Sequence, residues 1–183
     1  AEQHGQAHYS PHEARIDLPS IATILNRTMQ CLTGMGRPQT ALTLKDAVDM
    51  LADALGPDHP HTLTTRSNLA ITYQRVGNVR KALDMHQDLL TDRTRILGPD
   101  HRRTLTTRGN LAIAYRESGN LQKAIDMFED VLTDRTRILG PNHPHTLTTR
   151  GNLAIAYRES GNLQKAIDMF EDVLTDRTRI LGP

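Results

Sequence analysis

One segment of this chain occurs twice, letter for letter. Residues 104–141 are identical to residues 146–183, and a diverged copy occupies residues 61–99. The Leu-Gly-Pro motif that closes each copy returns every 42 residues. Repeats of this length are typical of solenoids, in which each helical unit packs mainly on its neighbours. The period therefore predicts one elongated domain with a continuous core.

The same period divides the chain into a tail and four units. We expect them at residues 1–16, 17–57, 58–99, 100–141 and 142–183. The first unit is degenerate: Gly36 matches Gly77 at a spacing of 41 residues instead of 42. We therefore expect this unit to have lost one residue, and we place the loss in its second helix.

The predicted tail contains three histidines at four-residue spacing, His4, His8 and His12. On one face of a helix they would suit a metal ion. Gly5 and Pro11 interrupt any helix in this stretch, however. A flexible tail is the favoured interpretation.

Each later unit is predicted to contain two helices. The first begins at a favourable N-cap residue, namely Asp58, Asp100 or Asn142. It ends at a glycine that permits a left-handed turn, namely Gly77, Gly119 or Gly161. The second helix has a broad apolar stripe, which in the third unit comprises Leu121, Ala124, Ile125, Phe128, Val131, Leu132 and Ile138. The pattern predicts an all-α fold, an α-solenoid of about four stacked helix-turn-helix units with eight helices.

Composition excludes several classes of function. Lys and Arg total 22 against 21 Asp and Glu, and aromatic residues make up 3% of the chain. The chain therefore lacks both the excess positive charge and the stacking surface that nucleic-acid binding requires. The single cysteine, Cys31, fits a reducing compartment. Because no apolar run or signal segment indicates a membrane or export, we predict a cytoplasmic protein.

The helical units resemble a known family. Asn110, Leu111, Ala112, Tyr115, Gly119, Ala124 and Phe128 stand at the spacings of the tetratricopeptide repeat. The 42-residue form with its LGPDHP linker at residues 55–60 is similar to the subtype found in kinesin light chains and in sensor arrays of STAND-type NTPases. The early tryptophan of the motif is replaced by arginine, at Arg66, Arg108 and Arg150.

This resemblance implies a right-handed superhelix whose first helices line a concave, peptide-binding groove. The family often uses an asparagine at one groove position to bind the peptide backbone, and that position maps onto Asn68, Asn110 and Asn152, with Arg27 in the first unit. The neighbouring groove positions map onto Thr64, Thr106, Thr148, Ile71, Ile113, Ile155, Gln74, Arg116 and Arg158. A purely structural role, in which the asparagines bridge adjacent helices, is the alternative.

Charged residues in the repeats have two interpretations. Arg116 and Arg158 would bind acidic side chains or a terminal carboxylate, or would pair with the adjacent Glu117 and Glu159. The helical pairs Asp92–Arg95, Asp134–Arg137 and Asp176–Arg179 indicate a solvated face.

Histidine and catalytic signals are weak. The linker histidines recur only because the linker recurs, and His86 replaces the phenylalanine of its sister units as a packing substitute. No phosphate-binding loop or nucleophile motif is present. Copies of one residue on parallel units form rows, whereas catalysis needs different groups at one point. We predict no enzyme activity, cofactor or metal.

Two functions remain. The first is a protein-binding module for a peptide or partner segment, as part of a larger signalling or regulatory protein. The alternative is a structural or self-assembling scaffold, because the third and fourth units differ at only three positions, 100/142, 102/144 and 103/145. The last helix carries an apolar stripe with no helix after it, so an end-to-end homodimer is expected.

Overall fold

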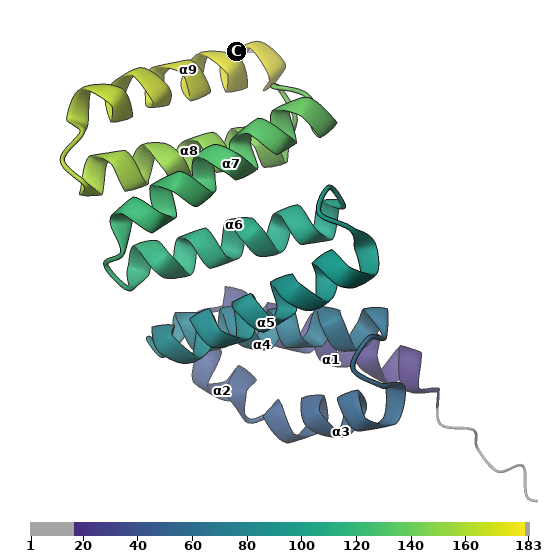
Figure 1. Cartoon of the computed structure of the whole chain (residues 1–183). Coiled ribbons are helices and arrows are strands. Elements are labelled where there is room, and N and C mark those ends of the chain that lie inside the picture. The colour runs from purple at the N-terminus through teal and green to yellow at the C-terminus, as the bar shows by residue number, and fades with distance from the viewer. Residues whose placement is uncertain (1–16, 182–183) are drawn as a thin grey trace, which may run out of the picture.

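The computed structural model describes residues 17–181, apart from the side chains of residues 177 and 179–181. All regular structure in this range is helical, and the helices stack in one direction (Figure 1). They are α1 (Leu18–Gly34), α2 (Pro38–Leu42), α3 (Lys45–Leu55), α4 (Pro60–Arg75), α5 (Val79–Leu97), α6 (Arg102–Glu117), α7 (Leu121–Leu139), α8 (Pro144–Glu159) and α9 (Leu163–Leu181). The predicted all-α solenoid is confirmed. The predicted tail and its histidines lie outside the described residues.

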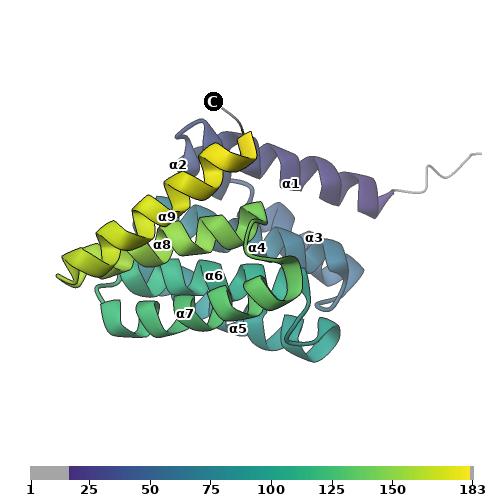
Figure 2. The ribbon, with the colours of Figure 1, turned by 90° about the horizontal axis from the view of Figure 1, so that it is seen from above.

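The helices form two layers. We call α1, α4, α6 and α8 the A helices, and α2 with α3, α5, α7 and α9 the B helices. Each later A helix packs against the B helices before and after it, and α4, α6 and α8 also contact one another in sequence. Figure 2 shows the stack from above. Apolar residues of the A and B layers fill the space between them, with Phe128 and Leu105 fully buried.

The first B segment is divided in two. Residues 38–55 form α2 and α3, with Thr43 and Leu44 between them outside both helices. This segment is one residue shorter than α5, as the 41-residue spacing predicts. The missing residue therefore coincides with a break that the sequence pattern does not indicate.

The predicted N-cap residues are wrong by one position. His59, His101 and His143 cap α4, α6 and α8, because each Nδ1 accepts a hydrogen bond from the backbone N–H two residues later, at 3.1–3.2 Å. The aspartates that precede two of them pair with the B helix instead. Asp58 accepts from Arg95 at 3.0 Å, and Asp100 accepts from Arg137 at 2.8 Å.

The helix ends agree with the sequence. Gly77, Gly119 and Gly161 have φ values of 83°, 84° and 88°, a region that side-chain-bearing residues rarely adopt. They end the A helices, as predicted. Among the helices within residues 17–181, none combines the length and the apolar character that a membrane span requires.

The arginines that replace the family tryptophan tie each A helix to its B helix. Arg66, Arg108 and Arg150 pair with Asp92, Asp134 and Asp176 at 2.7, 2.5 and 2.7 Å. The predicted pairs Asp92–Arg95 and Asp134–Arg137 are also present, at 3.6 and 3.1 Å, whereas the side chain of Arg179 is not described. Arg95 and Arg137 are 56% and 55% exposed, as a solvated face predicts, whereas Asp92 and Asp134 are 25% exposed because they also pair with Arg66 and Arg108.

Candidate functional site

The predicted groove residues lie on α4, α6 and α8. Because these helices contact one another in sequence, the asparagine, threonine and isoleucine positions each form a row across them. Most of these side chains are half-buried, while Thr148 and Arg158 are exposed and Asn68 is buried. A peptide that crosses α4, α6 and α8 along one of these rows would contact the same type of side chain on each helix.

Asn68 already has partners within the chain. Its Nδ2 donates to Asn26 Oδ1 at 2.9 Å, and its Oδ1 accepts from Gln30 Nε2 at 3.3 Å. Both partners lie on α1, and Asn68 is only 8% exposed. Arg27, which the repeat pattern assigns to this position in the first unit, is exposed and does not take part in the contact between α1 and Asn68. For Asn68 the structural alternative, a bridge between helices, is therefore the one observed.

Asn110 and Asn152 differ from Asn68. Both side chains are half-buried on α6 and α8. Neither amide has a hydrogen-bond partner among the residues that the structure describes. An asparagine amide can donate and accept at the same time, which matches the alternating N–H and C=O groups of an extended chain.

The threonine row uses its donors internally. Thr64, Thr106 and Thr148 donate to the backbone carbonyl four residues earlier, at 2.8, 2.9 and 2.8 Å. Their hydroxyl oxygens keep lone pairs for accepting a hydrogen bond. These residues can therefore accept from a partner but do not have a donor to offer.

The arginine row is paired with glutamate. Arg116 lies 3.8 Å from Glu117 and 3.7 Å from Glu159 of α8, and Arg158 lies 4.0 Å from Glu159. These separations are long for ion pairs, and solvent reaches the glutamates, which are 36% and 38% exposed, so the pairs contribute little to stability. The pairing alternative is thus present, and an acidic ligand would have to compete with Glu159.

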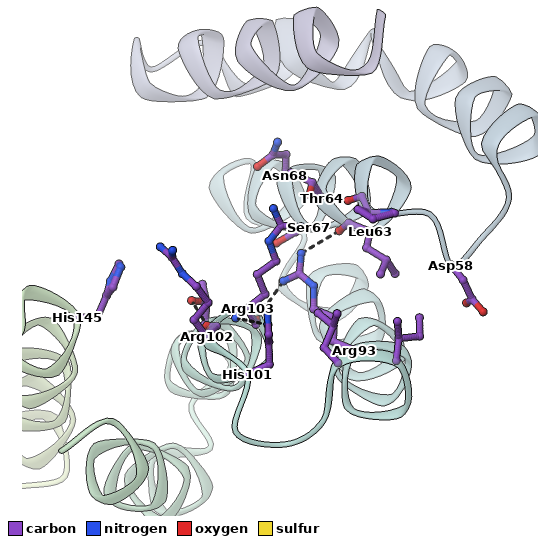
Figure 3. Close-up of a pocket in the computed structure, with 14 residues that line it drawn as sticks. Asp58, Leu63, Thr64, Ser67, Asn68, Arg93, His101, Arg102, Arg103 and His145 are labelled. Atoms are coloured by element: carbon purple, nitrogen blue, oxygen red, sulfur yellow. Dashed lines mark hydrogen bonds between the residues drawn. The ribbon is translucent and has the colours of Figure 1, made fainter. Parts of the chain in front are cut away.

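A group of positively charged side chains lies beside these rows. A cavity of about 610 Å³ opens between the N-terminal halves of α4 and α6 (Figure 3). Its polar lining includes Arg93, His101, Arg102, Arg103 and His145. The groove residues Thr64, Asn68 and Thr106 also line it. Sequence analysis missed this cavity, although Arg102 and Arg103 are two of the three positions at which the third unit differs from the fourth.

The cavity has one acidic lining residue, Asp58. Both of its carboxylate oxygens accept hydrogen bonds from Arg95, at 3.0 and 2.5 Å. This pairing lowers the pKa of Asp58 through the Arg95 hydrogen bonds. Asp58 is therefore paired with Arg95 and forms no ion pair with the buried Arg93 or the exposed Arg102 and Arg103 that line the cavity.

Two buried arginines connect successive helical pairs. Arg93 of α5 donates to the Leu63 carbonyl of α4 at 3.2 Å and to Thr107 Oγ1 of α6 at 2.7 Å. Arg135 of α7 repeats the arrangement with the Leu105 carbonyl and Thr149, at 3.3 and 2.6 Å. Neither arginine forms an ion pair with an acidic side chain of the described residues. Sequence analysis missed this role, for which the only signal is an arginine facing the core side of an amphipathic helix.

Histidine geometry favours structure over chemistry. The rings of His59 and His61 stack with centroids 5.5 Å apart, and those of His143 and His145 at 5.3 Å. Within residues 17–181, no group of three His, Cys, Asp or Glu side chains is arranged to hold a metal ion. His86 is fully buried, and neither ring nitrogen has a hydrogen-bond partner. Burial lowers the pKa of His86 to about 4, so it packs as a neutral ring.

Comparisons with protein families and with solved structures both match the chain to helical repeat proteins. The sequence profile of the tetratricopeptide repeat matches residues 20–94, 74–136 and 131–179. None of the curated proteins matches the chain. Solved structures are similar to most of its length.

One similar structure is a protein of Podosopora anserina described as a candidate kinesin light chain with nearly identical TPR-like repeats. It is 27% identical over 88% of this chain and 77% of that chain, with a TM-score of 0.75. A single-substitution variant of that protein is 26% identical over 93% and 81%, also with a TM-score of 0.75. BtubC (BKLC) from P. vanneervenii has a TM-score of 0.76 at 20% identity, over 91% and 67% of the two chains, which supports the fold alone.

Proposed function

The chain belongs to the tetratricopeptide repeat family, whose repeats generally mediate protein–protein interaction, and on that premise we propose that it binds an extended segment of a partner protein across α4, α6 and α8. The fold is generally a non-enzymatic interaction scaffold. We further propose that this binding module serves a larger signalling or regulatory protein.

The observation that carries this proposal is the contrast within the asparagine row. The Asn68 amide donates to Asn26 and accepts from Gln30. Asn110 and Asn152 occupy the equivalent position of the later units but keep half-buried, unpaired amides in the described part of the chain. A half-buried amide without a partner loses part of its hydration without compensation. A peptide backbone passing over α6 and α8 would satisfy both amides.

The neighbouring residues suit such a segment. Ile113 and Ile155 are half-buried on the same two helices and offer apolar contact. The oxygens of Thr106 and Thr148 can accept from backbone N–H groups. Because the two helices repeat the same residues, the surface suits an extended chain whose contacts are mainly to backbone.

A displayed library of random twelve-residue peptides tests this function. Peptides selected on the wild-type chain are measured by fluorescence anisotropy against the double variant Asn110→Ala/Asn152→Ala. We expect at least a tenfold loss of affinity, because each amide contributes hydrogen bonds to the backbone. The matched control is Gln39→Ala/Gln122→Ala, which alters two exposed amides of the B helices. Equal affinity of all three proteins would contradict the proposal.

A second function, self-assembly, is favoured by a separate observation on α9. Leu163, Ile167, Phe170 and Leu174 are 58%, 50%, 38% and 67% exposed. They follow one another at intervals of four, three and four residues, the spacing of a helix–helix seam. We propose that this stripe binds the same stripe of a second copy.

The stripe is symmetric about its own middle. In an antiparallel pair centred between residues 168 and 169, Leu163 faces Leu174 and Ile167 faces Phe170 of the other copy. Such self-complementarity is what a two-fold interface requires. Gln164 and Glu171 flank the stripe on one side, so the pair brings a carboxylate beside an amide and avoids like charges.

Sedimentation velocity over a range of concentrations tests self-assembly. We expect a monomer–dimer equilibrium for the wild type and a monomer for Leu174→Lys. The control Met50→Lys changes an equally exposed apolar residue of α3, which is 72% exposed, and should leave the dimer intact. Open-ended growth in place of a dimer would indicate head-to-tail contact with α1, where Ile21 and Ile24 are exposed, and would contradict the two-fold pair.

A further inference from the structure

The cavity between α4 and α6 has a lining that calls for a negatively charged ligand. Three arginine side chains line it, Arg93, Arg102 and Arg103, and none of them forms an ion pair within the described residues. The one acidic lining residue, Asp58, is held by Arg95. The volume of about 610 Å³ is in the range of small-ligand sites.

The positive charges are held close to one another. Arg93 is 4% exposed, and its Nε has no hydrogen-bond partner. Its pKa falls to about 10, first through burial and then through repulsion by Arg103 and Arg66. The pKa of His145 is likewise lowered, first by burial and then by Arg135, His143 and Arg102. An anion placed among these groups would relieve the repulsion between them.

The arrangement of the side chains directs them to the same space. In Figure 3, Arg103 and Arg102 extend from the beginning of α6, and Arg103 rises toward Ser67 on α4. Arg93 approaches from α5 and donates to the Leu63 carbonyl. Helices α5 and α6 therefore both supply arginines to the cavity. Thr64 and Asn68 of α4 line the same cavity and also belong to the threonine and asparagine rows.

Comparison of the third and fourth units shows that the extra positive charge is present at the start of α6 and not at the start of α8. Arg102 and Arg103 of α6 are replaced by Pro144 and His145 at the beginning of α8, in an otherwise nearly identical unit. The buried arginine is retained in both places, as Arg93 and Arg135. The change of two residues therefore adds two arginines, at one step of the stack, beside a structural contact that both steps share.

We propose that this cavity binds the acidic side chains of the partner segment, with Arg102 and Arg103 as the residues that select them. This inference rests on the proposed peptide-binding function and names the chemistry of the peptide. Carboxylates and phosphoryl groups share that chemistry, since both accept paired hydrogen bonds from a guanidinium group.

The chain supplies its own matched variants. Arg102→Pro/Arg103→His gives the start of α6 the sequence of α8, which forms the same helix in the same fold. Pro144→Arg/His145→Arg does the reverse and should build a second basic cavity at the next step, and it also puts a charged arginine in place of His145 in the lining of the first cavity. Both changes copy sequence that the fold already contains, so circular dichroism should show unchanged helix content.

The probes are hexaglutamate, a hexapeptide of alternating phosphoserine and glycine, inorganic phosphate and a twelve-residue oligothymidine. Binding is followed by amide NMR shifts at low and moderate salt. We expect hexaglutamate to shift amides at the starts of α4 and α6, with affinity at least tenfold lower in Arg102→Pro/Arg103→His. The reverse variant should bind two equivalents, and added salt should weaken every one of these interactions.

Several results would overturn the inference. Equal hexaglutamate affinity in the wild type and Arg102→Pro/Arg103→His would remove these arginines from the site. Tighter binding of oligothymidine would assign the cavity to nucleic acid, and phosphate alone binding as tightly as either peptide would assign it to a free anion. Stronger binding of the phosphoserine peptide than of hexaglutamate would support the inference with phosphoryl groups as the preferred source.

The peptide library separates this inference from the proposed function. Selected peptides without acidic residues that depend on Asn110 and Asn152 would uphold the function and overturn the acidic preference. Selected acidic peptides that lose affinity in both the asparagine and the arginine variants would uphold both.

Discussion

Helices α7 and α9 have the same 19 residues and different surroundings. In α7 the side chains of Ile125 and Phe128 are 6% and 0% exposed, whereas their counterparts Ile167 and Phe170 in α9 are 50% and 38% exposed. The difference arises from α8, which covers α7 on the side that α9 leaves open among the described residues. The apolar stripe in the sequence therefore shows which side chains a helix can bury, and the neighbouring helix determines how much of their surface is buried.

The largest expected effect comes from removing the equivalent phenylalanine ring from α7 and from α9. Phe128→Ala should lower the free energy of unfolding by about 3–5 kcal/mol, the usual cost of deleting a buried phenylalanine. Phe170→Ala should cost less than about half of that, because 38% of Phe170 is already exposed. Urea denaturation of the two variants at low protein concentration measures both values. Equal losses would mean that α9 is covered in solution.

Helix α5 allows a further comparison, because it has His86 at the position that Phe128 occupies in α7 and Phe170 in α9. This ring is fully buried and unpaired, so His86→Phe should stabilise the protein by about 1–3 kcal/mol through added apolar burial. Thermal denaturation at pH 7 checks the sign. A destabilised variant would show that the cavity shaped around the imidazole does not admit the larger ring.

The same residue predicts a pH dependence. The folded-state pKa of His86 is about 4, below an unfolded value near 6.5. As pH falls, the unfolded chain takes up the proton first, so stability is complete above about pH 6.5 and declines toward pH 4. The loss amounts to roughly 3 kcal/mol at 1.36 kcal/mol per pKa unit. Denaturation midpoints across pH 4–7 should show this slope in the wild type and a shallower one in His86→Phe.

A local interaction should behave alike in both helices. Asn120 caps α7 by accepting from the Lys123 N–H at 3.3 Å. Replacing it with alanine should cost about 1 kcal/mol. Residues 162–165 repeat the sequence of residues 120–123, so Asn162→Ala should cost the same if a cap depends only on the sequence of its own turn. Denaturation of the two variants side by side makes the measurement. A large difference would show that the cap, too, depends on the neighbouring helix.

The smallest expected effect concerns the linkers. Asp100→Asn copies the residue that stands at Asn142 and removes the exposed pair with Arg137, which has a separation of 2.8 Å. Screening by solvent makes such pairs weak, so the midpoint should shift less than in Asn120→Ala. A larger shift would indicate that the linker pair supports the helix junction.

Much of the fold follows from the sequence because repetition and helical spacing are local signals. The helix ends at Gly119 and Gly161 need only a backbone that adopts positive φ. The N-caps are mispredicted because aspartate is the stronger general candidate, whereas here Arg95 and Arg137 recruit the aspartates and leave the cap to His59 and His101. That competition involves residues 37 positions apart, which no local pattern reports.

The candidate site is predictable only in part. The asparagine row follows from the family motif, but the engagement of Asn68 depends on Asn26 and Gln30 of a degenerate unit. The basic cavity escapes prediction, because Arg93 and Arg103 meet only when α4, α5 and α6 are stacked. Two substitutions that look minor along the chain change the charge of a space that three helices share.

The buried arginine bridges also bear on how such a chain can change length. Arg135 belongs to one unit, and the His145 carbonyl and Thr149 that receive it belong to the next, at 3.0 and 2.6 Å. The second and third units thus each carry the arginine donor for the next unit, and the third and fourth units carry the threonine that accepts from it. Recombination between the identical segments 104–141 and 146–183 would add or delete a whole unit and still leave every donor opposite an acceptor. A chain lengthened or shortened in this way would keep the hydrogen bonds at the junctions between its repeated units.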